Sequence, residues 1–145
     1  MTDKQHSPFG SEITSEQVVA TMQTFTTWEQ RYRQVVQWGK LLPKMADEQK
    51  IAQVMVSGCE SQVWLVCEQD GDLWHIQADS DARIVRGLIA LVLAAYQDKT
   101  SEQIQAFDIT DYFAQMGLIE HLSPSRSNGL MAIIAEVQKA AGAVH

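Results

Sequence analysis

The spacing of hydrophobic and polar residues predicts a small sheet in the middle of the chain. The runs Val54 to Val56 and Val63 to Cys67 are apolar and rich in β-branched residues, as strands are, and a polar turn separates them. An Asp70-Gly71 pair follows and favours a hairpin. We therefore expect strands over residues 51–56, 62–68 and 73–78, with the hairpin turn over residues 69–72.

Helical periodicity predicts helices at both ends of the chain. Apolar residues recur every three or four positions before the predicted strands, and Thr14 with Gln17 forms a capping box. After the strands, one very apolar helix is expected to lie at the centre of the fold. The expected helices cover residues 15–25, 28–41, 82–98, 101–106, 109–117 and 128–141.

The order of these elements predicts the fold class. Helices, then strands, then helices are typical of an α+β domain and not of alternating βαβ units. We expect a small antiparallel sheet of about three strands, packed against N-terminal and C-terminal helices. The length of 145 residues suits a single domain over 1–145, with residues 1–10 loosely ordered.

Charge and hydropathy narrow the possible partners and location. The formal net charge of −7 argues against nucleic acid and anionic membranes as partners. The N-terminus has no apolar signal region, and the longest apolar run, residues 87–96, is too short to span a bilayer. We therefore expect a cytoplasmic protein.

Cys59 is the main candidate for chemistry. It lies in the predicted loop beside Gly58, where a thiol is either reactive or buried and inert, and the residues alone leave both interpretations open. The anionic Glu60 would raise the pKa of the thiol, so any activation must come from another part of the fold or from a partner. The second cysteine, Cys67, is expected to pack as a small hydrophobe.

The remaining chemical signals are weak. The sequence has no phosphate-binding loop or dinucleotide fingerprint. Its histidines are scattered singly, so we expect no metal site, and two cysteines are too few for an iron–sulfur scaffold. A thiol hydrolase would need His75 or His121 to meet Cys59 in the fold, and no local signature supports that pairing.

Four segments of the sequence carry motifs of a known family. They are Ser57-Gly58-Cys59-Glu60-Ser61-Gln62-Val63-Trp64-Leu65, Trp28 to Arg33 with Gly39 to Pro43, Asp79 to Leu88, and Leu122 to Leu130. These segments resemble the SufE-like sulfur acceptors, which are the partners of cysteine desulfurases. The match includes Asn128 where the family has Gln, and it runs in order from about Pro8 to the C-terminal helix. The residues Ile84-Val85-Arg86-Gly87 and Ser7-Pro8-Phe9-Gly10 favour the CsdE branch of the family.

The resemblance implies a reactive Cys59 and a function in sulfur transfer. A pyridoxal-phosphate cysteine desulfurase would pass persulfide sulfur to Cys59, and the carrier would stimulate that enzyme. The carrier would then relay sulfur to an iron–sulfur scaffold or another thiolation enzyme. The pyridoxal phosphate would belong to the desulfurase, so this chain would need no cofactor. The alternative is a non-catalytic adaptor that binds and activates the desulfurase without carrying sulfur.

Several residues around Cys59 receive predicted roles. We expect Gly58 to act as the hinge of a loop that includes Glu60 and Ser61, which would protect the persulfide when closed. Arg126 either bonds carbonyl groups at a helix end or lies near the cysteine loop and favours a thiolate or persulfide anion.

Four arginines are candidates for partner contacts. Arg83 and Arg86 share one helix face, where they either pair with Asp79 or glutamates in a structural role or contact the desulfurase. Arg31 and Arg33 are either part of a solvated helix surface or part of the partner interface.

Overall fold

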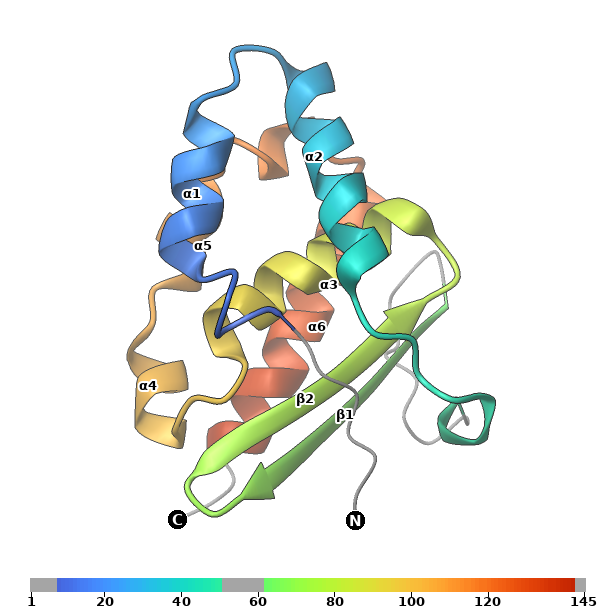
Figure 1. Ribbon diagram of the computed structural model, residues 1–145, viewed down its shortest axis with the longest axis vertical. Coiled ribbons are helices and arrows are strands. Elements are labelled where there is room, and N and C mark those ends of the chain that lie inside the picture. Colours follow the sequence, from blue (N-terminus) through green and yellow to red (C-terminus); the bar gives the residue numbers. More distant parts are fainter. Residues whose placement is uncertain (1–7, 51–61, 143–145) are drawn as a thin grey trace.

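A two-stranded hairpin lies along one side of a group of helices in the computed structural model, which describes residues 8–50 and 62–142 (Figure 1). The α+β class predicted from the sequence is confirmed. Two short 3-10 helices, η1 and η3, cover Asp47–Gln49 and Ile119–His121. The helices are α1 (Ser15–Gln23), α2 (Trp28–Leu41), α3 (Arg83–Tyr96), α4 (Ser101–Ala106), α5 (Ile109–Met116) and α6 (Pro124–Gly142).

The hairpin consists of β1 (Val63–Asp70) and β2 (Leu73–Ser80), which pair antiparallel. The register places Asp70 opposite Leu73, so the loop is Gly71-Asp72, one residue later than the predicted Asp-Gly centre. Gly71 has a φ of 63°, which favours glycine at the first loop position. The described residues contain two strands instead of about three, because the predicted strand over residues 51–56 lies outside them.

Helix starts follow the capping signals of the sequence in three cases. Thr14 and Gln17 form the predicted capping box, and Thr27 with Gln30 and Thr100 with Gln103 start α2 and α4 in the same way. The bounds of α2 and α4 match the prediction. In contrast, α6 begins at Pro124, four residues earlier than expected, because Ser123 Oγ accepts a hydrogen bond from the Arg126 N–H at 3.3 Å.

The central helix is α3, as predicted. Twelve of its 14 residues are buried, and it packs against α1, α2, α6 and β2. It starts at Arg83, one residue later than predicted, and its N-cap residue Ala82 makes no side-chain cap bond. It ends at Tyr96 and not at residue 98, because the chain turns away there and Asp98 adopts a φ of 56°. No helix of the described ranges has the length and apolarity needed to cross a membrane.

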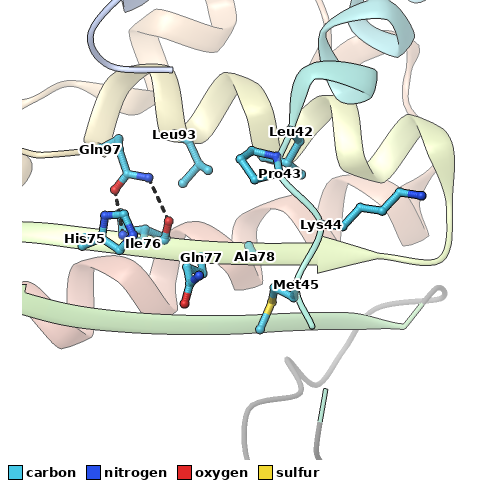
Figure 2. Close-up of a pocket in the computed structure, with 10 residues that line it drawn as sticks. All are labelled: Leu42, Pro43, Lys44, Met45, His75, Ile76, Gln77, Ala78, Leu93 and Gln97. Carbon is cyan, nitrogen blue, oxygen red and sulfur yellow. Dashed lines mark hydrogen bonds between the residues drawn. The ribbon is translucent and has the colours of Figure 1, made fainter. Parts of the chain in front are cut away.

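The Gln97 side chain, directly after α3, is hydrogen-bonded to β2. Its buried side-chain amide accepts a hydrogen bond from the Ile76 N–H at 2.7 Å and donates one to the Ile76 carbonyl at 2.8 Å (Figure 2). A cavity of about 20 Å³ lies beside this contact, also bordered by Leu42, Met45 and Leu93. That volume accommodates about one water molecule.

Phe9 belongs to the core, although the sequence predicted loose order over residues 1–10. Phe9 is fully buried, and the Gly10 N–H donates a hydrogen bond to the Ile13 carbonyl at 2.8 Å. The sequence pattern missed this because a single aromatic residue in a polar stretch carries no periodic signal.

Helices α2 and α3 cross with their backbones in close contact. A Cβ atom on Gly39 would lie 2.7 Å from the Gly87 nitrogen, and a Cβ atom on Gly87 would overlap the Val35 carbonyl oxygen. Glycine at both positions therefore permits the close approach of α2 and α3.

Gly87→Ala is expected to lower the free energy of unfolding by about 1–3 kcal/mol. The added methyl group meets backbone atoms of α2, which cannot rotate away as a flexible side chain can. Urea denaturation followed by circular dichroism measures the loss. Gly142→Ala is the control, because a Cβ atom there meets only the Gln105 amide at 3.3 Å. Equal stability of the two variants would contradict the tight crossing.

Candidate functional site

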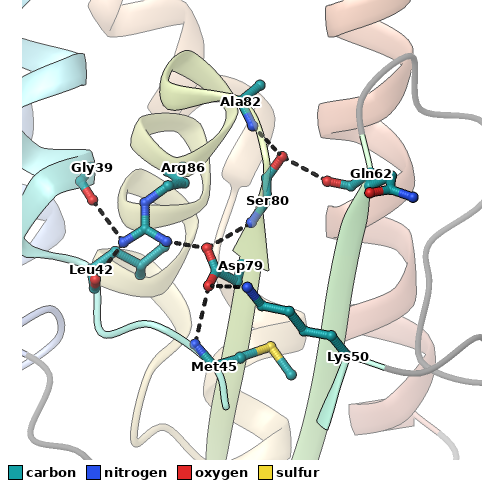
Figure 3. A network of polar contacts seen from close by, with 9 residues as sticks. All are labelled: Gly39, Leu42, Met45, Lys50, Gln62, Asp79, Ser80, Ala82 and Arg86. Atoms are coloured by element: carbon teal, nitrogen blue, oxygen red, sulfur yellow. Dashed lines mark hydrogen bonds and ion pairs between the residues drawn. The ribbon is translucent and has the colours of Figure 1, made fainter. Parts of the chain in front are cut away.

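Three consecutive residues at the end of β2 form a polar corner between the sheet and α3. We call Asp79, Ser80 and Asp81 the DSD corner (Figure 3). The Asp79 side chain is buried and forms an ion pair with Arg86. It also accepts hydrogen bonds from the Met45 N–H at 3.1 Å and the Ser80 N–H at 2.8 Å. These partners compensate the cost of burying a carboxylate.

Arg86 links the DSD corner to the end of α2. Besides its pair with Asp79, the guanidinium donates hydrogen bonds to the Leu42 carbonyl at 2.6 Å and to the Gly39 carbonyl at 3.3 Å. Arg86 therefore pairs with Asp79 in a structural role, which was one of its two predicted alternatives. Its contact with a desulfurase stays a prediction, and the network leaves few of its donors for a partner.

Lys50 and Gln62 are both attached to the DSD corner. Lys50 Nζ lies 3.4 Å from the Asp79 carboxylate and 5.0 Å from the centre of the Trp64 ring. Ser80 Oγ donates a hydrogen bond to the Gln62 carbonyl at 2.7 Å, and the Gln62 N–H donates one to Asp81 Oδ1 at 3.0 Å. Lys50 and Gln62, the described residues on either side of residues 51–61, are therefore both held at the DSD corner.

The residues between these two attachments include the main sequence candidates. Cys59, Gly58, Glu60 and Ser61 lie outside the described residues, so their predicted roles stay predictions. Of the contacts at this corner, the sequence predicted the Asp79–Arg86 pair as one alternative, but it did not predict that Lys50 and Gln62 meet the same corner. The available signal was a strand that ends on charged residues, since a buried charge requires a partner.

Arg126 lies in the first turn of α6. Its Nε atom is buried and has no hydrogen-bond partner in the described part of the chain. Among the described residues, Nε therefore does not bond a carbonyl group at a helix end, which was one of the two alternatives for Arg126. A helix N-terminus and a guanidinium both favour a nearby anion.

Cys67 is a poor nucleophile. The thiol is half-buried in β1, and burial raises its pKa to about 11, with the Glu136 carboxylate adding to the rise. At neutral pH it is therefore protonated, and only the thiolate attacks. Its predicted packing as a small hydrophobe is confirmed by its contact with the core.

The described residues contain no group of three or more His, Cys, Asp or Glu side chains arranged to hold a metal ion.

Arg83, unlike Arg86, is exposed at the start of α3. It borders an open groove of about 550 Å³ beside α2.

Comparison with known proteins gives consistent matches. Residues 16–141 match the family model described as SufE, Fe-S metabolism associated domain. An uncharacterised SufE-like protein of Rhizobium etli is 42% identical over 130 residues, which cover 87% of this chain and 88% of that protein. A second, from Rhizobium meliloti, is also 42% identical over 130 residues, covering 87% and 93%.

A solved structure supports the fold. The solution structure of a hypothetical protein from Thermus thermophilus superposes with a TM-score of 0.72 at 16% identity. The match covers 89% of this chain and 93% of that one. At this identity the likeness concerns the arrangement of helices and strands alone.

Proposed function

This chain belongs to the SufE family, and we propose that it carries sulfur on Cys59. The family implies a sulfur-acceptor role beside a cysteine desulfurase in Fe–S metabolism. In the proposal, Cys59 receives persulfide sulfur, the desulfurase turns over faster because its product is removed, and the sulfur passes to a scaffold or thiolation enzyme. The pyridoxal phosphate acts in the desulfurase, and this chain holds no cofactor of its own.

The chemical step is an exchange between sulfur atoms. The Cys59 thiolate attacks the outer sulfur of the persulfide on the desulfurase. A new S–S bond forms to Cys59, and the bond between the outer sulfur and the cysteine of the desulfurase breaks. That cysteine leaves as a thiolate. The step needs no oxidant or reductant, because one S–S bond replaces another.

The observation that carries the proposal is the double attachment at the DSD corner. Gln62 is the third residue after Cys59 and is hydrogen-bonded to both Ser80 and Asp81. Three peptide units extend at most about 11 Å, so sulfur accepted by Cys59 arrives near the corner. Because Gln62 is held in place, the region in which Cys59 can meet the persulfide of the desulfurase is limited.

Arg126 is proposed to stabilise the thiolate or persulfide anion of Cys59. Its Nε atom is buried without a partner in the described residues, and it lies where the dipole of α6 is positive. Helix α6 and strand β1 run in the same general direction (Figure 1), so the first turn of α6 and the start of β1 lie toward the same end of the molecule. This placement supports the anion-stabilising alternative.

Other parts of the proposal rest on the sequence. Arg83 is proposed to contact the desulfurase, which its exposure permits. The CsdE branch and a cytoplasmic location are proposed from the sequence features given above. The reducing cytoplasm keeps thiols available for transfer.

Mass spectrometry tests the proposal directly. The protein is incubated with a cysteine desulfurase and free cysteine, trapped without reductant and digested. We expect one added sulfur on the Cys59 peptide and none on the Cys67 peptide, whose thiol is the internal control because its pKa is about 11. An unmodified Cys59 peptide, while the desulfurase is active and stimulated, would reject the carrier function.

A further inference from the structure

An open groove runs along α2 beside the start of α3. It has a volume of about 550 Å³ and is lined by Trp28, Glu29, Tyr32, Arg33, Val36 and Arg83, which we call the α2 groove. Its lining combines aromatic and aliphatic side chains with charged ones. This composition is typical of the centres of protein interfaces, which are rich in Trp, Tyr and Arg.

The aromatic side chains of the groove are already ordered. The Trp28 ring stacks on His121, with ring centroids 4.7 Å apart and an interplanar angle of 17°. Its other neighbour is Tyr32, in an edge-to-face contact at 5.9 Å. Tyr32 nevertheless remains 42% exposed. A partner that covers these rings would lose little side-chain entropy in ordering them.

The arginines of the groove differ from the other arginines of α2 and α3. Arg31 donates to the Phe25 carbonyl at 3.1 Å and to the Met22 carbonyl at 3.3 Å, and Arg86 belongs to the Asp79 network. Arg33 and Arg83 are exposed, and neither side chain has an ion-pair or hydrogen-bond partner within residues 8–50 and 62–142. On a chain of net charge −7, a surface with two unpaired cations and one carboxylate favours an acidic partner.

We propose that an acidic segment of the cysteine desulfurase binds in the α2 groove. In this segment an apolar side chain lies between two carboxylates. The apolar side chain covers Trp28 and Tyr32, and the carboxylates pair with Arg33 and Arg83. The inference rests on the proposed function. Arg83 follows Asp81 by two residues, and Asp81 holds Gln62, so an enzyme that reaches Cys59 lies over the adjoining surface. The groove then provides affinity and orientation, while Cys59 provides the chemistry.

The test separates docking from chemistry. In Arg33→Glu/Arg83→Glu, we expect the Kd for the desulfurase to rise roughly tenfold or more, because both ion pairs become repulsive. Sulfur transfer to Cys59 at carrier concentrations below the wild-type Kd is expected to fall with the affinity. Lys139→Glu makes an exposed charge reversal on α6, outside the groove, and is expected to change the Kd less than about twofold. Tyr32→Ala, which removes an exposed ring, should also weaken binding.

Each outcome has a distinct meaning. An unchanged Kd in the double variant, with normal circular dichroism, would overturn the docking inference and leave the carrier function intact. A wild-type protein that binds the desulfurase through the groove but gains no sulfur would reject the carrier function alone. If analytical ultracentrifugation shows a wild-type dimer that the double variant loses, with no change in desulfurase affinity, a second copy occupies the groove and the inference fails.

Discussion

Cys59→Ser is expected to return the rate of the stimulated desulfurase to that of the enzyme alone. A serine hydroxyl is not ionised near neutral pH and cannot form a persulfide, so the carrier no longer removes the product sulfur. The measurement is the rate of alanine and sulfide formation from free cysteine, with and without this protein. Sulfur delivery to any downstream thiol should be lost to the same extent.

Cys67→Ser is the matched control. It replaces sulfur by oxygen at the other cysteine of the chain. The half-buried Cys67 thiol, with a pKa of about 11, has no expected part in transfer. We expect this variant to keep full stimulation. If Cys59→Ser still stimulates the desulfurase, the adaptor alternative replaces the carrier. Turnover of small substrates without any desulfurase would instead support a thiol hydrolase.

Asp79→Ala is expected to lower the free energy of unfolding by about 3–5 kcal/mol. The change leaves Arg86 as a buried charge with no counter-ion and removes the acceptor for the Met45 and Ser80 N–H groups. Domains of this kind are stable by about 5–15 kcal/mol, so the loss is a large share of the total. Urea denaturation monitored by tryptophan fluorescence measures it.

Two further variants check the physical cause. Asp72→Ala removes an exposed carboxylate in the hairpin loop and is expected to change stability by no more than about 0.5 kcal/mol. Asp79→Ala/Arg86→Met removes both charges and should recover part of the loss, because no unpaired charge stays buried. A loss in Asp79→Ala no larger than that of Asp72→Ala would contradict the assigned role of the buried pair.

Local signals in the sequence predicted most element starts. The Thr–Gln capping boxes and the Asp108 cap act within four residues, so the sequence alone specifies them. The hairpin was predicted for the same reason, although its loop is one residue later. The early start of α6 had an available signal in Ser123-Pro124, because proline is favoured at the first position of a helix.

Contacts between distant segments were not predictable in the same way. Lys50 meets Asp79 across 29 positions, and Arg86 reaches the Leu42 carbonyl across 44. Composition and periodicity identify a charged residue near an apolar helix, but they do not identify its partner in another element. The residues around Cys59 made it a candidate and the family resemblance favoured a reactive thiol, but neither decided whether Arg86 was structural.

The contact between Gln97 and Ile76 also affects how this protein behaves among other chains. A side-chain amide offers one donor and one acceptor, as a peptide group does, so Gln97 imitates a single residue of a neighbouring strand on the outer edge of β2. The Trp74 backbone groups on the same edge bond Lys99 and Asp98. At Trp74 and Ile76 this edge is therefore occupied, so residues 97–99, which follow α3, protect this part of β2 from strand addition and edge-to-edge aggregation.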